Sequence, residues 1–149
     1  SRMIELIQGG GVTSPMGFLA GGTYAGIKTA EDGAMDLAIL VSEQPASVGG
    51  VFTQNKVVSP SVILSRERVS KDTLRGVVVN SGCANCSVGS QGLSDAEEMT
   101  SLAAKHIGCD TEDMLVCSTG MIGVELPMAL VRQNIGNISC AVGGGIDFS

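Results

Sequence analysis

The fold of this chain is decided by residues 76–120, whose sequence is GVVVNSGCANCSVGSQGLSDAEEMTSLAAKHIGCDTEDMLVCSTG. The segment opens with a β-branched run at 76–80 and closes with an apolar run at 114–117, and both patterns are typical of short buried strands. Between them, apolar residues return every three or four positions over 95–107, which predicts an amphipathic helix. The segment therefore predicts a strand, a helix and a second strand, in that order.

The helix predicted over 95–107 carries signals at both ends. Ser94 and Glu97 match a capping box, in which each side chain satisfies a backbone N–H at the start of the helix. Gly108 follows as a residue that readily adopts the left-handed conformation in which many helices end. The face expected to be buried is formed by Met99, Leu102, Ala103 and His106.

Strand signals dominate the sequence before this helix. Three further β-branched runs lie between turn residues, at 36–41, 48–53 and 62–64. The Gly-rich stretch 9–26 predicts turns and short extended pieces, and Pro127 is well placed to begin a helix that runs to about Asn134. Strands followed by helices predict an α+β fold, and no linker or charge block divides residues 1–149, so we expect a single unit.

Composition and charge exclude several classes of function. The chain has 9 Lys and Arg against 15 Asp and Glu, a formal charge of −6, which argues against a nucleic-acid partner. Hydrophobic residues make up 44%, enough for a sizeable core, but no run approaches the roughly 18 apolar residues of a membrane helix. No export signal is visible and the five cysteines are an odd number, so we expect a cytoplasmic protein with reduced thiols and no membrane partner.

Three motifs have a structural interpretation that we prefer to a functional one. Residues 21–29 approach a phosphate-binding loop, but Ile27 interrupts the glycine-to-lysine spacing and no buried strand leads into the segment. Cys83 and Cys86 have the CxxC spacing of redox and zinc sites, but no second Cys or His pair follows at zinc-like spacing. His106 lies on the apolar face of the predicted helix, so we expect a hydrogen-bonded, partly buried side chain rather than a catalytic one.

Two turns combine small residues with the end of a buried strand, at 80–85 and 117–123. Acyl transfer needs hydrogen-bond donors aimed at an oxyanion, the negative oxygen that develops in the tetrahedral intermediate. In the second turn, the Thr119 hydroxyl stands next to the N–H of Gly120, which no side chain obstructs. These two residues can supply both donors of an oxyanion site, but from spacing alone a plain strand-to-helix turn is the preferred interpretation.

Several motifs, spaced in order along nearly the whole chain, resemble those of one enzyme family. They are GGVTSPMGF at 10–18, AGIK at 25–28, DLA at 36–38, GVFTQN at 50–55, VNSG at 79–82, QG at 91–92 and CSTGMIG at 117–123. The family is that of the bifunctional ornithine acetyltransferases, also called glutamate N-acetyltransferases or ArgJ proteins. An ordered set of motifs is far more specific than any one of them.

The resemblance implies a layered α/β sandwich similar to N-terminal nucleophile hydrolases of the DmpA/ornithine acetyltransferase kind. It also implies an enzyme of arginine biosynthesis that needs no metal and no organic cofactor. Family members cut themselves before a Thr, which becomes the nucleophile of a β chain; this chain is similar to the α chain, and an α2β2 assembly is implied. By a ping-pong mechanism, that Thr moves acetyl from N2-acetylornithine to glutamate, and acetyl-CoA is left open as a second donor. Thr119 and Gly120 match the family's oxyanion-hole pair.

The chain departs from the family pattern in two places. Family α chains run on past the position of Ser149, so we expect the nucleophilic Thr and further substrate-binding residues to lie outside this sequence. Cys83 and Cys86 stand where family members often carry Asn and Ala. Two other functions stay open: a related self-processing amidase or aminopeptidase, and a non-enzymatic redox or metal-binding module built on the CxxC pair.

Overall fold

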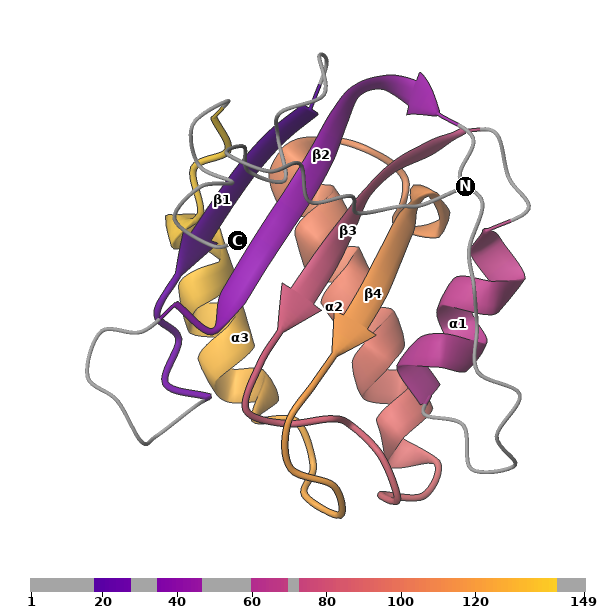
Figure 1. Ribbon diagram of the computed structural model, residues 1–149, viewed down its shortest axis with the longest axis vertical. Coiled ribbons are helices and arrows are strands. Elements are labelled where there is room, and N and C mark those ends of the chain that lie inside the picture. The colour runs from indigo at the N-terminus through magenta and orange to yellow at the C-terminus, as the bar shows by residue number, and fades with distance from the viewer. Residues whose placement is uncertain (1–17, 28–34, 47–59, 70–72, 142–149) are drawn as a thin grey trace, which may run out of the picture.

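A computed structural model describes residues 18–27, 35–46, 60–69 and 73–141 of the chain. Within them lies a four-stranded sheet in the order β1-β2-β3-β4 (Figure 1). Its members are β1 (Phe18–Thr23), β2 (Leu37–Ala46), β3 (Leu74–Asn80) and β4 (Met114–Ser118). β2 pairs antiparallel with β1 and β3, whereas β3 and β4 are parallel. A parallel pair needs a crossover connection, and the long helix between β3 and β4 provides it.

Helices cover one face of the sheet, behind the strands in Figure 1. They are α1 (Pro60–Arg68), α2 (Gln91–Ile107) and α3 (Met128–Asn134), with short 3-10 turns η1 (Thr111–Asp113) and η2 (Ile135–Asn137). The main core lies between them and the sheet, where Met99 of α2 and Val131 of α3 are fully buried. Among the described residues, no helix has the length and apolar character that crossing a membrane requires.

Side chains alternate between the two faces of the sheet, as the pleat dictates. Val78 and Val116 point into the core below the helices, whereas Val77 and Leu115 belong to a second apolar cluster on the opposite face. The second cluster consists of Ala20, Leu40, Leu74, Val77 and Leu115. Both faces therefore bury apolar side chains, which confirms the predicted layered α+β fold.

The strands predicted at 36–41, 76–80 and 114–117 are present as β2, β3 and β4, and the run at 48–53 lies outside the described residues. The run at 62–64 was predicted as a strand and is wrong, because it lies in α1. On the buried side of α1, the Ser65 hydroxyl donates to the Val116 carbonyl oxygen (2.8 Å) and accepts from the Val116 N–H (3.1 Å). This attachment to β4 outweighs the β propensity of three residues, and it places a helix before β3.

The Gly-rich stretch 9–26, predicted as turns and short extended pieces, contains strand β1. A second segment approaches β1 closely: Ala20 and Ala141 exchange backbone hydrogen bonds of 3.0 and 2.9 Å. A Cβ at Gly21 would overlap the carbonyl oxygen of Ser139, so this approach requires glycine.

Helix α2 begins at Gln91, before the predicted start at residue 95. Ser94 therefore lies inside the helix, and the predicted capping box with Glu97 is wrong; the N-cap residue is Ser90, which makes no side-chain cap hydrogen bond. The predicted end is confirmed, because Gly108 is left-handed (φ 85°) and its N–H bonds the Ala104 carbonyl oxygen. On the predicted buried face Met99 and Ala103 are fully buried and Leu102 is half-buried, but His106 is exposed.

Candidate oxyanion site

The turns that follow β3 and β4 form one unit. The two strands pair in register to their last residues, Asn80 and Ser118, so their ends lie side by side (Figure 1). Backbone hydrogen bonds continue between the turns: the Thr119 N–H donates to the Asn80 carbonyl oxygen (3.0 Å) and the Met121 N–H to that of Gly82 (3.3 Å). The two turns singled out from the sequence, 80–85 and 117–123, are therefore brought together by the parallel pairing.

Gly120 is the point of closest approach between the turns. Its φ is 125°, a value that L side chains rarely adopt. A Cβ at this position would overlap the backbone of Gly82 and Cys83, so only glycine fits. Gly120 itself is exposed, and within the described part of the chain its N–H has no hydrogen-bond acceptor. The position therefore offers a backbone donor to solvent or to a ligand.

Thr119 precedes this donor and is also exposed. Its hydroxyl donates to the Asn80 carbonyl oxygen over 3.4 Å, which is longer than the usual 2.7–2.8 Å of an O–H···O bond. Such a long hydrogen bond is weak, so the hydroxyl rotates away from Asn80 at little cost. Thr119 and Gly120 thus present two neighbouring donors in the exposed turn after β4, as an oxyanion site requires.

Two buried side chains that the sequence did not reveal, Asn80 and Asn85, hydrogen-bond the backbone of the first turn and of α2. Asn80 and Asn85 are fully buried. The amide nitrogen of Asn80 donates to the Cys83 carbonyl oxygen, and that of Asn85 to the Gly92 carbonyl oxygen of α2, both over 2.8 Å. The available signal was an asparagine directly after the buried run 77–79, but a sequence does not reveal that its side chain points inward.

Comparison with known proteins shows the family of this chain. A sequence model of the ArgJ family matches residues 19–145. The chain belongs to the ArgJ family.

Two curated ArgJ relatives illustrate the similarity. The "Arginine biosynthesis bifunctional protein ArgJ" of Geobacter sulfurreducens is 46% identical over 85% of this chain and 32% of its own length. The protein of the same name from Dehalococcoides mccartyi is 38% identical over 98% of this chain and 36% of its own length. The chain thus spans about a third of the length of these relatives.

Solved structures of the ArgJ family have the same fold. The ArgJ structure from Bacillus halodurans superimposes with a TM-score of 0.87 at 33% identity and covers 95% of this chain and 74% of that one. The ornithine acetyltransferase from Mycobacterium tuberculosis, complexed with ornithine, gives a TM-score of 0.89 at 34% identity and covers 96% of this chain and 78% of that one.

In this ArgJ-family chain, the contacts of Cys83 and Cys86 favour a structural role for the CxxC pair. Cys83 is buried in the main core and its thiol donates to the Val124 carbonyl oxygen (3.1 Å), whereas the Cys86 sulfur lies 3.9 Å from the Ser87 hydroxyl. Both thiols are free. No group of three or more His, Cys, Asp or Glu side chains placed to hold a metal occurs in the part of the chain that the structure describes.

The remaining sequence motifs lie on β1 and α2 rather than in the two turns. Gly21 to Thr23, the start of the stretch compared with a phosphate loop, are part of β1, and residues 28 and 29 lie outside the described residues. His106 is near the end of α2, about 22 Å along the helix axis from Gln91. Its Nε2 donates to the Ile138 carbonyl oxygen (2.6 Å), so the predicted hydrogen-bonded role fits, although the ring is exposed rather than partly buried.

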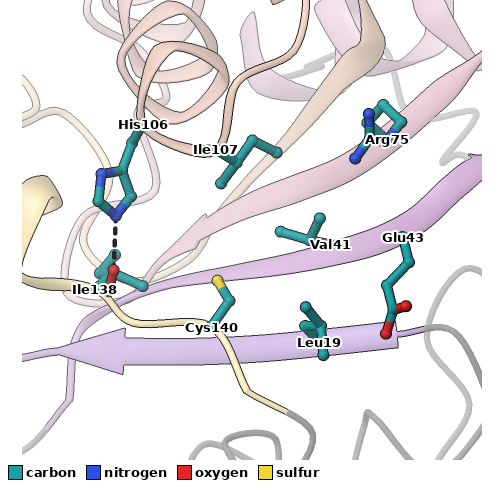
Figure 2. A pocket seen from close by; sticks show the side chains of 8 residues that line it. All are labelled: Leu19, Val41, Glu43, Arg75, His106, Ile107, Ile138 and Cys140. Atoms are coloured by element: carbon teal, nitrogen blue, oxygen red, sulfur yellow. Dashed lines mark hydrogen bonds between the residues drawn. The ribbon is translucent and has the colours of Figure 1, made fainter.

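A cavity of about 370 Å³ lies at the opposite end of the sheet from the turns (Figure 2). It is lined by Leu19, Val41, Glu43, Arg75, His106, Ile107, Ile138 and Cys140. Burial raises the pKa of the Cys140 thiol. The strand from Arg75 to Asn80 spans about 16 Å, so this cavity is separate from the oxyanion site.

Proposed function

We propose that this chain supplies the oxyanion-binding part of an acetyltransferase that moves acetyl from N2-acetylornithine to glutamate in arginine biosynthesis. The observation that carries the proposal is the exposed Gly120 N–H, without an acceptor among the described residues, beside the weakly held hydroxyl of Thr119. The names of the relatives, which refer to arginine biosynthesis and to ornithine acetyltransferase, support this choice of substrates.

In the first half-reaction, the hydroxyl of an N-terminal Thr outside this chain attacks the acetyl carbonyl carbon of N2-acetylornithine. The carbonyl π electrons move to oxygen, and the Thr119 hydroxyl and Gly120 N–H stabilise that negative charge. When the intermediate collapses, the C–N bond breaks, the nitrogen takes a proton and ornithine leaves. The acetyl group remains on the Thr as an ester.

In the second half-reaction, the amine of glutamate attacks this ester. The same two donors stabilise the second tetrahedral intermediate, since its oxyanion occupies the same position. Collapse breaks the ester C–O bond and releases N-acetylglutamate, and the proton lost by the glutamate amine goes to the Thr oxygen. A donor pair that serves both steps explains why one oxyanion site suffices for a ping-pong reaction.

The family resemblance extends the proposal to the whole protein. We expect an α chain and a β chain produced by self-cleavage, assembled as α2β2 in the cytoplasm, with no metal or organic cofactor. Acetyl-CoA as an additional acetyl donor is tested directly by adding it in place of N2-acetylornithine.

The proposal is tested on the full-length protein by measuring ornithine release with and without glutamate. Without glutamate we expect a burst of one ornithine per active site and an acetylated polypeptide in the mass spectrum, and with glutamate we expect steady turnover. Ornithine and acetate released continuously without glutamate would instead assign the protein to the amidases.

A further inference from the structure

Asn80 makes hydrogen bonds in both turns of the oxyanion site. Its amide nitrogen donates to the Cys83 carbonyl oxygen over 2.8 Å and, more weakly, to that of Ser81 over 3.4 Å. Its own carbonyl oxygen accepts the Thr119 N–H over 3.0 Å and the Thr119 hydroxyl over 3.4 Å. The side chain thus holds the first turn, while the backbone holds the second.

This arrangement carries an energetic cost. Asn80 has no exposed surface, and its side-chain oxygen, Oδ1, has no hydrogen-bond donor among the described residues. A buried acceptor without a partner has lost its water and gained nothing in exchange, so it destabilises the fold. An apolar side chain of similar size would avoid this cost, but it would leave the Cys83 carbonyl oxygen without its donor. Asn85 carries the same cost, but Asn80 is the one of the two that bonds Thr119 directly, and this contact points to a role in the site.

We propose that Asn80 is a positioning residue that sets the direction of both oxyanion donors. Its side chain fixes residues 81–83, and the backbone of Gly82 and Cys83 is the surface against which Gly120 packs. Its carbonyl oxygen holds the Thr119 hydroxyl until a more negative oxygen competes for that proton. The inference rests on the proposed function, because it assumes that Thr119 and Gly120 bind an oxyanion.

The test is Asn80→Asp in the full-length protein, since this change keeps the shape of the side chain and replaces the donor with an acceptor. Where the introduced acid is ionised, its carboxylate faces the Cys83 carbonyl oxygen, and at the high end of the pH range we expect kcat to fall roughly 10- to 100-fold with little change in KM. Burial favours the protonated acid, which regains a donor, so kcat should recover as the pH is lowered. The wild-type protein should lack this recovery.

Asn85→Asp is the matched control. Asn85 is equally buried, donates to the Gly92 carbonyl oxygen over 2.8 Å and also has a side-chain oxygen without a partner among the described residues, but it ties the first turn to α2 rather than to Thr119. We expect a similar loss of stability, a smaller fall in kcat than in Asn80→Asp and no recovery at low pH. An equal loss of kcat in both variants would overturn the positioning role.

A second variant and a second measurement keep the inference testable if Asn80→Asp fails to fold. Asn80→Ser is neutral and too short to reach Cys83, so it should lose kcat without the recovery at low pH. Hydrogen exchange at the Thr119 and Met121 amides, measured without substrate, should be faster in Asn80→Ser than in wild type. Unchanged exchange would contradict the positioning role, whereas a wild-type protein without acetyl transfer would contradict the proposed function and leave the exchange result standing.

Discussion

The hydroxyl of Thr119 is held by one long hydrogen bond to Asn80, so it turns readily toward a developing oxyanion. Charge appears on that oxygen only as the tetrahedral intermediate forms. We therefore expect Thr119→Ala to lower kcat roughly 10²- to 10³-fold with a much smaller change in KM, whereas Thr119→Ser should retain much of the rate. Steady-state kinetics should use protein in which the proposed cleavage into two chains is complete, because that cleavage would pass through a similar intermediate. A wild-type kcat in Thr119→Ala would return the turn to a structural role.

The Cys140 thiol offers a test of burial by titration. It is half-buried, and burial raises the pKa of its thiol, so the folded chain keeps it protonated at pH values where the unfolded chain ionises it. Its contribution to stability is present below the unfolded pKa of about 8.5 and is lost as the pH rises through the folded pKa. At pH 8.5 we expect iodoacetamide to modify Cys140 more slowly in native than in urea-unfolded protein, as measured by peptide mass spectrometry. In addition, Cys140→Ala should reduce the loss of stability above this pH; equal alkylation rates would contradict the prediction.

At the scale of residues, the sequence predicts the proposed donors but not their support. Thr119 and Gly120 are neighbours in the chain at the end of a buried run, so their chemistry is visible locally. Asn80 contacts Thr119 across 39 positions, and its burial depends on strands packing from both sides. Long-range contact of this kind leaves no local pattern in a single sequence.

The C-terminal end of helix α2 is expected to depend on Gly108. The helix ends at Gly108 with φ 85°, and a Cβ there would meet nothing within 4 Å, so Gly108→Ala tests conformation alone. We expect it to lower the free energy of unfolding by about 1 kcal/mol. Gly136→Ala is the control, because its Cβ also meets nothing within 4 Å and its φ is not in the left-handed region, and it should cost less than about 0.5 kcal/mol. Urea unfolding of both variants checks this; equal losses would be inconsistent with it.

The two ends of α2 show why elements are predicted unevenly. The end depends on one residue, Gly108, whose conformational preference is local. The start depends on tertiary contacts: a Cβ at Gly92 would crowd Pro60 of α1 and the side chain of Asn85. The same reason explains α1, where burial of Ser61 and Ser65 against β4 overrides a β-branched run.

In the whole molecule, the parallel register of β3 and β4 brings together the two turns that form the proposed oxyanion site. The strand, helix and strand over 76–117 were predictable from periodicity, and the crossover follows from them. That Asn80 pairs with Ser118, and so that the two turns meet, follows only from the assembled sheet. The layered arrangement then leaves the turn after β4 exposed at one edge while both faces of the sheet bury apolar side chains.

The last prediction concerns the nucleophile that this molecule must receive. A Thr or Ser hydroxyl needs a base, and the chain's single His lies near the far end of α2, about 22 Å along the helix from Gln91. An N-terminal Thr brings its own base, the free amine. We therefore expect residues 1–149 expressed alone to release no ornithine from N2-acetylornithine above the buffer rate, whereas co-expression with the remainder of the protein should yield activity and a second polypeptide that begins with Thr. N-terminal sequencing and the ornithine assay measure both outcomes. Full transferase activity from the 149 residues alone would show that the nucleophile and its base lie within this chain. It would contradict the proposal that this chain contributes only the oxyanion donors Thr119 and Gly120.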